Sequence, residues 1–160
     1  MDIKEAVRKR RSVRSYRDKE ISEDVLNEVL NAARLAPSAR NDQKWKFIAV
    51  RDENIREKIS QAANNQKFVG EAPVVIAGVS LDPDRVMSCE VPAYAVDLGI
   101  AMDHITLAAV ENGLGTCWIG AFSQERVKEI LDIPEEYKVA ALMPIGYPAD
   151  SPSSKSRKQF

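Results

Sequence analysis

Apolar residues recur at intervals of three and four positions in several stretches of the chain, a spacing that predicts helices. The clearest stretch opens at Ser22, a good N-cap residue, and is followed by two acidic residues in the first helical turn. Its apolar face runs from Val25 to Ala33. Similar patterns predict helices over 3–10, over 52–63 and over 123–131.

Other stretches favour β-strands. Residues 45–50 alternate in the manner of a strand, and the continuous apolar run 73–79 is typical of a central strand buried on both faces. Residues 115–120 and 138–145 predict two further strands. Between the helix that ends near Ala33 and the first strand, Pro37 requires a loop over 36–41.

Residues 91–110 are nearly all apolar and long enough for a membrane span. Asp97, Asp103 and His104 interrupt the run, and Asn112-Gly113 is a helix stop, so a helix buried on nearly all sides is the better interpretation. A domain this small has too little protein to surround such a helix. We therefore expect the helix to form the core of a dimer.

The order of these elements predicts a three-layer α/β/α domain, of the α/β or the α+β class, with a sheet at its centre. The 160 residues are enough for one hydrophobic core, and we expect a single domain over 1–146. Residues 147–160 are rich in proline and serine and lack periodicity. They form a basic C-terminal tail that is either disordered or wraps over a neighbour.

Charge is balanced overall, with 23 basic and 24 acidic residues and a net charge of -1, which argues against a generically basic nucleic-acid binder. The two ends are nevertheless positive, at +4 for residues 1–20 and +2 for 147–160, around a body at -7. Two interpretations remain open at this point: the ends are solvated, or they converge on one anion.

The two cysteines and single histidine cannot assemble a tetrahedral zinc site in one chain, so we expect no metal. His104 lies in an apolar run and is interpreted as a packed or interface residue rather than a catalytic one. Cys89 and Cys117 lack a CxxC neighbour, which favours a reduced chain over a disulfide. The charged start of the chain lacks a signal-peptide pattern, and we expect a cytoplasmic protein.

Four segments carry candidate chemistry. Arg10-Arg11-Ser12-x-Arg14 offers guanidinium groups and a hydroxyl for a phosphate, without any Walker A or GxGxxG motif. The loop 37–43 offers hydroxyl and amide groups for a heterocycle, and the glycines of 115–120 permit a flat ring to approach the backbone. The tail adds Lys155 to Lys158. Taken singly, none of the four favours a ligand site over a simpler explanation as a solvated face, a polar turn, a core strand or a loose end.

Together these segments resemble the flavin-dependent nitroreductase family over nearly the whole chain. The similarity rests on four stretches: Arg10-Arg11-Ser12-Val13-Arg14-Ser15-Tyr16, Ala32-Ala33-Arg34-Leu35-Ala36-Pro37-Ser38-Ala39-Arg40-Asn41-Asp42-Gln43-Lys44-Trp45, Gly113-Leu114-Gly115-Thr116-Cys117-Trp118-Ile119-Gly120 and Gly146-Tyr147-Pro148. The resemblance implies a mixed sheet flanked by helices and a homodimer with two FMN molecules at its interface. It also implies hydride transfer from NADH or NADPH through FMN to a nitroaromatic, a quinone or a similar acceptor.

The resemblance assigns cofactor contacts but no catalytic side chain. The FMN phosphate would be held by the segment of Arg10, Arg11 and Ser12. The tail would add Arg157 and Lys155 to the phosphate site. Arg14 would lie by the pyrimidine end of the flavin ring. The residues expected at the flavin of the other subunit are Pro37, Ser38, Ala39 and Asn41. Those expected to line the ring are Trp118, Ile119 and Gly120, with the Gly120 backbone N–H as the contact to N5; Asn64 and Lys67 are left open.

Two departures from the family pattern bear on specificity. Lys44 stands where relatives commonly have proline, and the chain leaves little between Gly78 and the long helix. The site is therefore either open and undiscriminating or made specific by residues 81–92. Three rival interpretations remain: other flavin chemistry on the same fold (dehalogenation, flavin fragmentation or flavin storage), a phosphate- or nucleic-acid-binding module, and a structural dimerisation protein.

Overall fold

The computed structural model describes residues 1–150 and 156–159. Its elements follow the predicted order closely, with one further short helix, α4, and a short 3-10 helix, η1, in the loop before the first strand. Their bounds are α1 Ile3–Lys9, α2 Glu23–Arg34, η1 Ala39–Asn41, β1 Trp45–Val50, α3 Glu53–Ala62, α4 Lys67–Glu71, β2 Val74–Ser80, α5 Ala93–Glu111, β3 Gly115–Thr116, α6 Gln124–Ile130 and β4 Lys138–Gly146.

Side chains at the N-caps explain where the helices begin. The Ser22 hydroxyl accepts the N–H of Val25 at 3.4 Å and the Asp52 carboxylate accepts the N–H of Ile55 at 2.9 Å. Such bonds satisfy backbone donors that have no partner within the helix. The helices expected to open at Ser22 and Asp52 are thus confirmed, with these two residues as their caps.

The sheet has the strand order β1-β2-β4-β3, and each neighbouring pair of strands is antiparallel. The resemblance implies a mixed sheet, which contains parallel pairing as well. Parallel pairing is found in an isolated bridge between Ser12, which lies outside the four strands, and Thr116 at the outer edge of β3. The expected strand 115–120 is regular only at its start. Farther on it stays beside β4 through a second isolated bridge, between Ile119 and Leu142.

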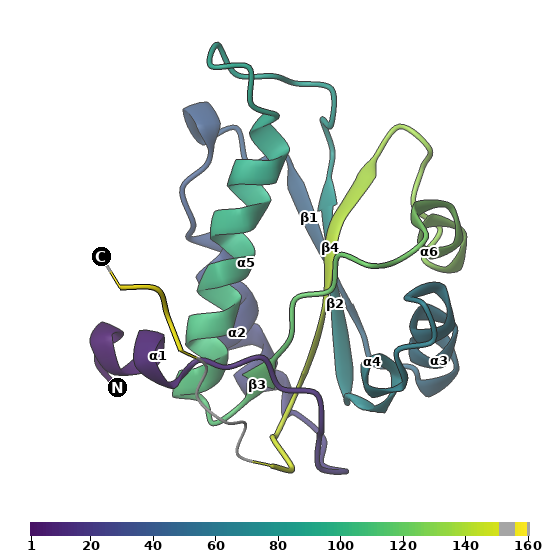
Figure 1. Ribbon diagram of the computed structural model, residues 1–160. Coiled ribbons are helices and arrows are strands. Elements are labelled where there is room, and N and C mark those ends of the chain that lie inside the picture. Colours follow the sequence, from purple (N-terminus) through teal and green to yellow (C-terminus); the bar gives the residue numbers. More distant parts are fainter. Residues whose placement is uncertain (151–155, 160) are drawn as a thin grey trace.

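Helices cover both faces of the sheet in three layers (Figure 1), as the sequence predicts. Helices α2 and α5 pack on one face around Ile76 and Met143, whereas α3, α4 and α6 pack on the other around Val75 and Leu142. Strand β2 is buried along its whole length between these layers. It is the central strand that the run 73–79 predicts.

Helix α5 is buried on one side only, so the expectation of burial on nearly all sides is wrong for the single chain. Its buried side faces α2 and the sheet. The positions Val96, Ile100, Leu107 and Val110 recur at helical spacing and are exposed or half-buried. By length and composition α5 is apolar enough to cross a membrane, but its packing against α2 and the sheet is that of a core helix.

Candidate functional site

The N-terminal segment after α1 is held against the edge of the sheet by backbone bonds. The N–H of Val13 donates to the carbonyl of Thr116 at 2.9 Å. The Tyr16 hydroxyl donates to the carbonyls of Val13 at 2.8 Å and Pro144 at 3.3 Å. Burial raises the pKa of the Tyr16 phenol well above its usual range, so the group remains a proton donor. Two motifs far apart in sequence therefore lie side by side.

Successive side chains of this extended segment point to opposite sides of the backbone, so Val13 points away from the side of Ser12 and Arg14. Val13 packs against Gly115, where an added Cβ would lie only 2.4 Å from Val13 Cγ2. Ser12 and Arg14 consequently face away from that contact. The guanidinium groups of Arg10 and Arg14 make no hydrogen bond or ion pair within residues 1–150 and 156–159, which leaves their donors for an anion.

The guanidinium of Arg11, unlike those of Arg10 and Arg14, is bonded to backbone carbonyls of the described residues. Its Nη1 donates to the carbonyl of Arg8, in the last turn of α1, and to that of Arg10, just beyond the end of the helix. It also lines a surface pocket of about 450 Å³ together with Arg8 and Lys9. This geometry gives Arg11 a role in closing the C-terminal end of α1 and does not place its guanidinium with those of Arg10 and Arg14.

The segment after β3 presents one apolar ring and one open stretch of backbone. Trp118 is 41% exposed, and an ideal Cβ built on Gly120 meets no atom within 4 Å. A flat ligand therefore has room to reach the Gly120 backbone. Ile119 is 3% exposed and both of its backbone groups pair with Leu142, so its side chain does not line this open surface.

The turn at Asn64 lies close to Gly120. Nε2 of Gln66 donates to the carbonyl of Ala121 at 3.3 Å, and the N–H of Ser123 donates to Ala62 at 2.9 Å. Asn64 itself is exposed with φ of 58°, a left-handed conformation that asparagine tolerates better than most residues. The position left open in the sequence is thus adjacent to the candidate ring site.

The loop 37–43 has an unusual backbone. Arg40, Asn41 and Gln43 all have φ between 52° and 56°, and left-handed backbone costs a non-glycine residue about 1–2 kcal/mol. Two side chains hold this shape. The Asp97 carboxylate accepts the N–H of Ala39 at 2.9 Å, and the Ser38 hydroxyl accepts the N–H of Gln43 at 3.1 Å. The sequence pattern did not predict that Asp97 contacts this loop. It showed Asp97 only as an acidic residue inside an apolar helix.

The loop 37–43 lies far from the Arg10 segment in the same chain. It contacts the start of α5 at Asp97, whereas the N-terminus of Met1 binds Glu111 at the other end of that helix at 3.1 Å. Asp97 and Glu111 are separated by about 21 Å along the helix, at a rise of about 1.5 Å per residue. The loop also leads into β1, which is at the opposite edge of the sheet from β3. One chain therefore carries two candidate half-sites, the Arg10 segment and the loop 37–43, which do not meet.

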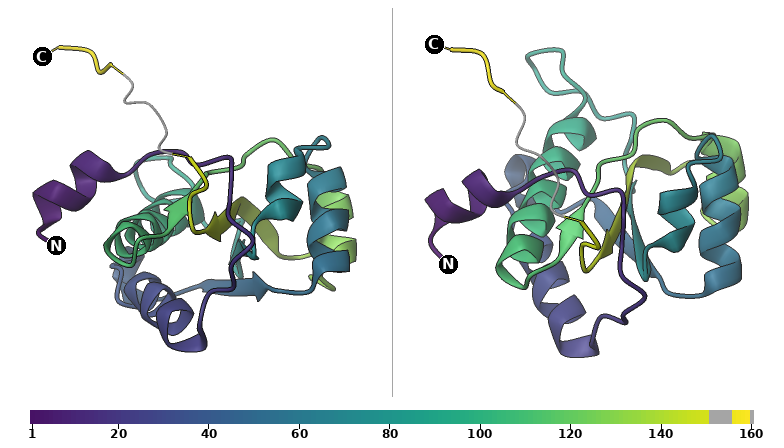
Figure 2. Two further views of the ribbon diagram at one scale, coloured as in Figure 1. Left: turned by 90° about the horizontal axis from the view of Figure 1, so that it is seen from below. Right: turned by 60° about the horizontal axis from the view of Figure 1, so that its bottom comes forward.

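The end of the chain stands apart from both half-sites. Residues 156–159 are exposed, and the views in Figure 2 show them projecting away from the layers. Among the described residues, Nη1 of Arg157 donates only to the carbonyl of Ser156, at 3.5 Å. Lys155, the other expected phosphate ligand of the tail, lies outside the described residues. Within the described part of the chain, no hydrogen bond or shared partner links Arg157 to Arg10.

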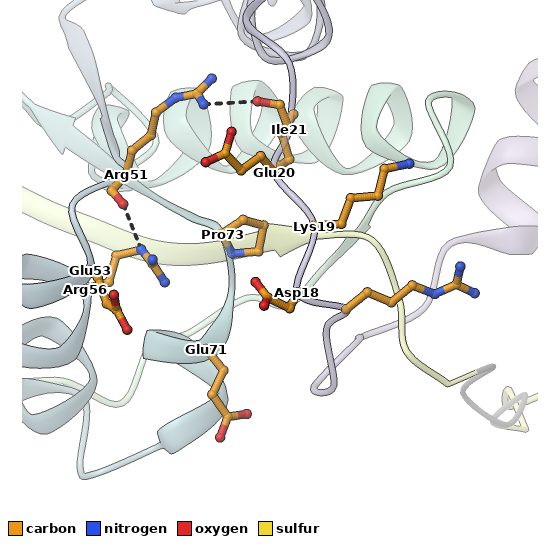
Figure 3. A pocket seen from close by; sticks show the side chains of 10 residues that line it. Asp18, Lys19, Glu20, Ile21, Arg51, Glu53, Arg56, Glu71 and Pro73 are labelled. Atoms are coloured by element: carbon orange, nitrogen blue, oxygen red, sulfur yellow. Dashed lines mark hydrogen bonds between the residues drawn. The ribbon is translucent and has the colours of Figure 1, made fainter.

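Other polar features are explained by structure. A pocket of about 290 Å³ is lined mainly by charged residues (Figure 3), but Arg51 and Arg56 there bind backbone carbonyls.

His104 packs with Nδ1 3.3 Å from the carbonyl of Ala32 on α2, as a packed histidine would. In the described part of the chain, no three His, Cys, Asp or Glu side chains are grouped to hold a metal ion.

Comparison with known proteins identifies the family to which the chain belongs. A family profile described as the nitroreductase family matches residues 7–79 and 60–147. A nitroreductase family protein from Clostridium novyi NT has a similar structure, with a TM-score of 0.87 and 35% identity over 97% of this chain and 89% of its own.

Two further relatives are named for flavin chemistry. An FMN reductase [NAD(P)H] from Bacillus subtilis is 32% identical over 92% of this chain and 66% of its own length. The NADPH:FMN oxidoreductase of Vibrio harveyi, solved in complex with NAD+, has a TM-score of 0.87 and 28% identity over 96% of this chain and 71% of its own. With a profile match over most of its length and a relative this similar in sequence and structure, the chain belongs to the nitroreductase family.

Proposed function

We propose that the protein is an FMN-dependent oxidoreductase that takes a hydride from NADH or NADPH and delivers it to a small acceptor such as a nitroaromatic or a quinone. The bond from Val13 to Thr116 is the observation that carries the proposal, because it places the guanidinium-rich segment beside β3, from which the chain continues to the open surface at Gly120. The names of the Bacillus subtilis and Vibrio harveyi relatives support the choice of cofactor.

The donor set fits a flavin phosphate. Arg10 and Ser12 offer a charged fork and a hydroxyl, and a phosphate dianion accepts hydrogen bonds from both kinds of donor. Arg157, with Lys155, would complete the phosphate site from the tail, which we expect to wrap over the partner subunit. Arg14 would lie at the pyrimidine end of the ring, where its positive charge favours a negatively charged reduced state.

The open surface fits the ring. Trp118 offers an apolar wall and Gly120 lets a flat ring approach the backbone, with the Gly120 N–H as the expected donor to N5. When bound, FMN supplies the two-electron chemistry. The protein needs no nucleophile or general base of its own. Its residues bind and orient the ring and leave one side open, so that donor and acceptor occupy the same place in turn.

A homodimer would join the two half-sites. Pro37, Ser38, Ala39 and Asn41 of one chain would reach the flavin that the Arg10 segment of the other holds. Val96 is exposed and Ile100 is half-buried on the same side of α5, and this supports the arrangement, because a second copy would remove these side chains from water. We place the enzyme in the cytoplasm, which suits a chain whose two cysteines lie outside any CxxC motif.

The test begins with the visible absorption spectrum of the purified protein, before and after anaerobic addition of NADH or NADPH. We expect flavin bands that bleach with the nucleotide, and FMN in the supernatant after heating. Steady consumption of NAD(P)H with a nitroaromatic or quinone would then identify a reductase. Bleaching without turnover would favour other flavin chemistry on this fold, and a colourless protein that cannot be reconstituted with FMN would overturn the proposal.

A further inference from the structure

One segment of the chain holds the loop 37–43 in place from outside. Ala39 donates its N–H to the Asp97 carboxylate at 2.9 Å, as described above. At the end of the loop, the N–H of Leu81 donates to the carbonyl of Lys44 at 3.0 Å. Both partners belong to residues 81–97, so the two ends of the loop are fixed to the same part of the structure.

A third contact lies between these two. Arg85 forms an ion pair with Asp42, and both side chains are partly buried. Arg85 belongs to a small hairpin that is closed by an antiparallel bridge between Val86 and Pro92, and its carbonyl accepts the N–H of Ala93 at 3.0 Å. The hairpin therefore continues directly into α5 and connects the loop to a rigid helix.

We propose that Asp97 is the positioning residue for the flavin-contacting loop, and that Arg85 ties the hairpin 81–92 to the same loop through Asp42. The assignment to a flavin rests on the proposed function. The positioning role rests on the three contacts themselves. Asp97 does not touch the cofactor in this proposal; it fixes the backbone of residues that do.

The backbone of the loop explains why an outside partner is needed. Three of its residues adopt left-handed conformations that are sparsely populated in a free chain, and such backbone persists only where surrounding contacts hold it. Asp97 lies in the second turn of α5, so its carboxylate is placed by the helix rather than by the loop. A loop fixed before the ligand arrives loses less conformational entropy on binding.

The experiment compares Asp97→Leu with Asp97→Asn. Leucine is similar in size but has no acceptor for the Ala39 N–H, whereas the asparagine oxygen keeps the acceptor and removes only the charge. Two readouts are needed: amide hydrogen exchange of residues 38–44 in the apoprotein, and the dissociation constant for FMN from quenching of flavin fluorescence. The first needs no cofactor.

For Asp97→Leu we expect faster exchange over 38–44 and about tenfold weaker FMN binding, the loss that follows from one hydrogen bond to a charged acceptor. Asp97→Asn should restore slow exchange and bring the affinity to within about threefold of wild type. Wild-type exchange and affinity in Asp97→Leu would overturn the proposal.

Arg85→Met provides an independent variant if Asp97→Leu does not fold. It should raise exchange over 38–44 by a smaller amount, because a partly exposed ion pair contributes less than a hydrogen bond to a fixed backbone donor. Unchanged exchange would remove Arg85 from the proposal. If wild-type protein binds no FMN while Asp97→Leu still exchanges faster over 38–44, the flavin function fails and the positioning role stands.

Discussion

The side chain of Val13 occupies the place where a side chain on Gly115 would have to stand. An added Cβ on Gly115 would lie 2.4 Å from Val13 Cγ2 and 2.8 Å from Val13 Cβ. This close contact lets the N-terminal segment pair with Thr116, and it explains why glycine is needed here. The packing of these two residues therefore sets the spacing between the proposed phosphate and ring sites.

Gly115→Ala should lower the free energy of unfolding by about 1–3 kcal/mol, the usual cost of an overpacked core. Urea unfolding followed by circular dichroism would measure it. Adding Val13→Ala to Gly115→Ala should recover part of the loss, because the smaller side chain makes room for the new methyl group. A Gly115→Ala protein as stable as wild type would contradict this account of the contact.

Gly120→Ala should leave the free energy of unfolding almost unchanged and should weaken FMN binding instead. The new methyl group meets nothing within 4 Å in the chain, so the free energy of unfolding should stay within about 0.5 kcal/mol of wild type. The methyl group would nevertheless stand in the path of the ring. We expect FMN binding to weaken by about tenfold or more in a fluorescence titration. Unchanged affinity would argue that the ring lies elsewhere.

Arg14→Leu should lower the midpoint potential of the bound flavin, because it removes a positive charge that favours the reduced state. The expected shift is about 30 mV for each 1.4 kcal/mol of lost interaction in a two-electron couple. Spectroelectrochemical titration would measure it. The matching control is Arg34→Leu, an exposed arginine on α2 that bonds Asn31. Equal potentials in the two variants would remove the role given to Arg14.

Arg56 is expected to matter for stability rather than for catalysis. Its Nη1 donates to the carbonyls of Gly70 and Ala72, both at 2.5 Å, and Figure 3 shows its Nε bonded to Arg51. Arg56→Met would leave the partly buried carbonyls of Gly70 and Ala72 without this donor, which costs about 1–3 kcal/mol in the free energy of unfolding.

Arg51→Met is the control for this prediction. The ion pair of Arg51 with Glu23 is exposed, so losing it should lower the free energy of unfolding by about 1 kcal/mol or less. The variant also loses one hydrogen bond, from Arg51 to the carbonyl of Ile21. Thermal unfolding of both variants should therefore rank Arg56→Met as the less stable. The reverse order would show that the carbonyls at Gly70 and Ala72 find another partner.

Val96→Glu tests the dimer. A charge in the exposed apolar face of α5 would have to be buried by association, which is strongly unfavourable without a partner charge. We expect a monomer by size-exclusion chromatography with light scattering, and loss of FMN with it. Lys58→Glu, on α3 beyond the sheet, should stay dimeric. A Val96→Glu monomer that retains flavin would contradict the shared site.

Local rules accounted for most of the elements. The caps at Ser22 and Asp52 and the apolar run of β2 act through neighbouring residues, so the sequence pattern predicts them. The short helix α4 was not predicted, because its five residues are too few to show a periodic pattern. The expected strand 115–120 is regular only over Gly115 and Thr116, since its remaining pairing depends on where β4 lies.

The amino-acid sequence by itself determined the layered class, the order of elements and the motifs that resemble a flavin enzyme, because these depend on periodicity and on residue type at fixed spacing. Only the tertiary structure decided that the Arg11 side chain bonds carbonyls at the end of α1, that Ile119 is buried, and that Asp97 holds the loop at Ala39. It also placed the two candidate half-sites, the Arg10 segment and the loop 37–43, at opposite ends of α5. Such relationships depend on contacts between distant residues, and no local pattern encodes the direction in which a side chain finally points.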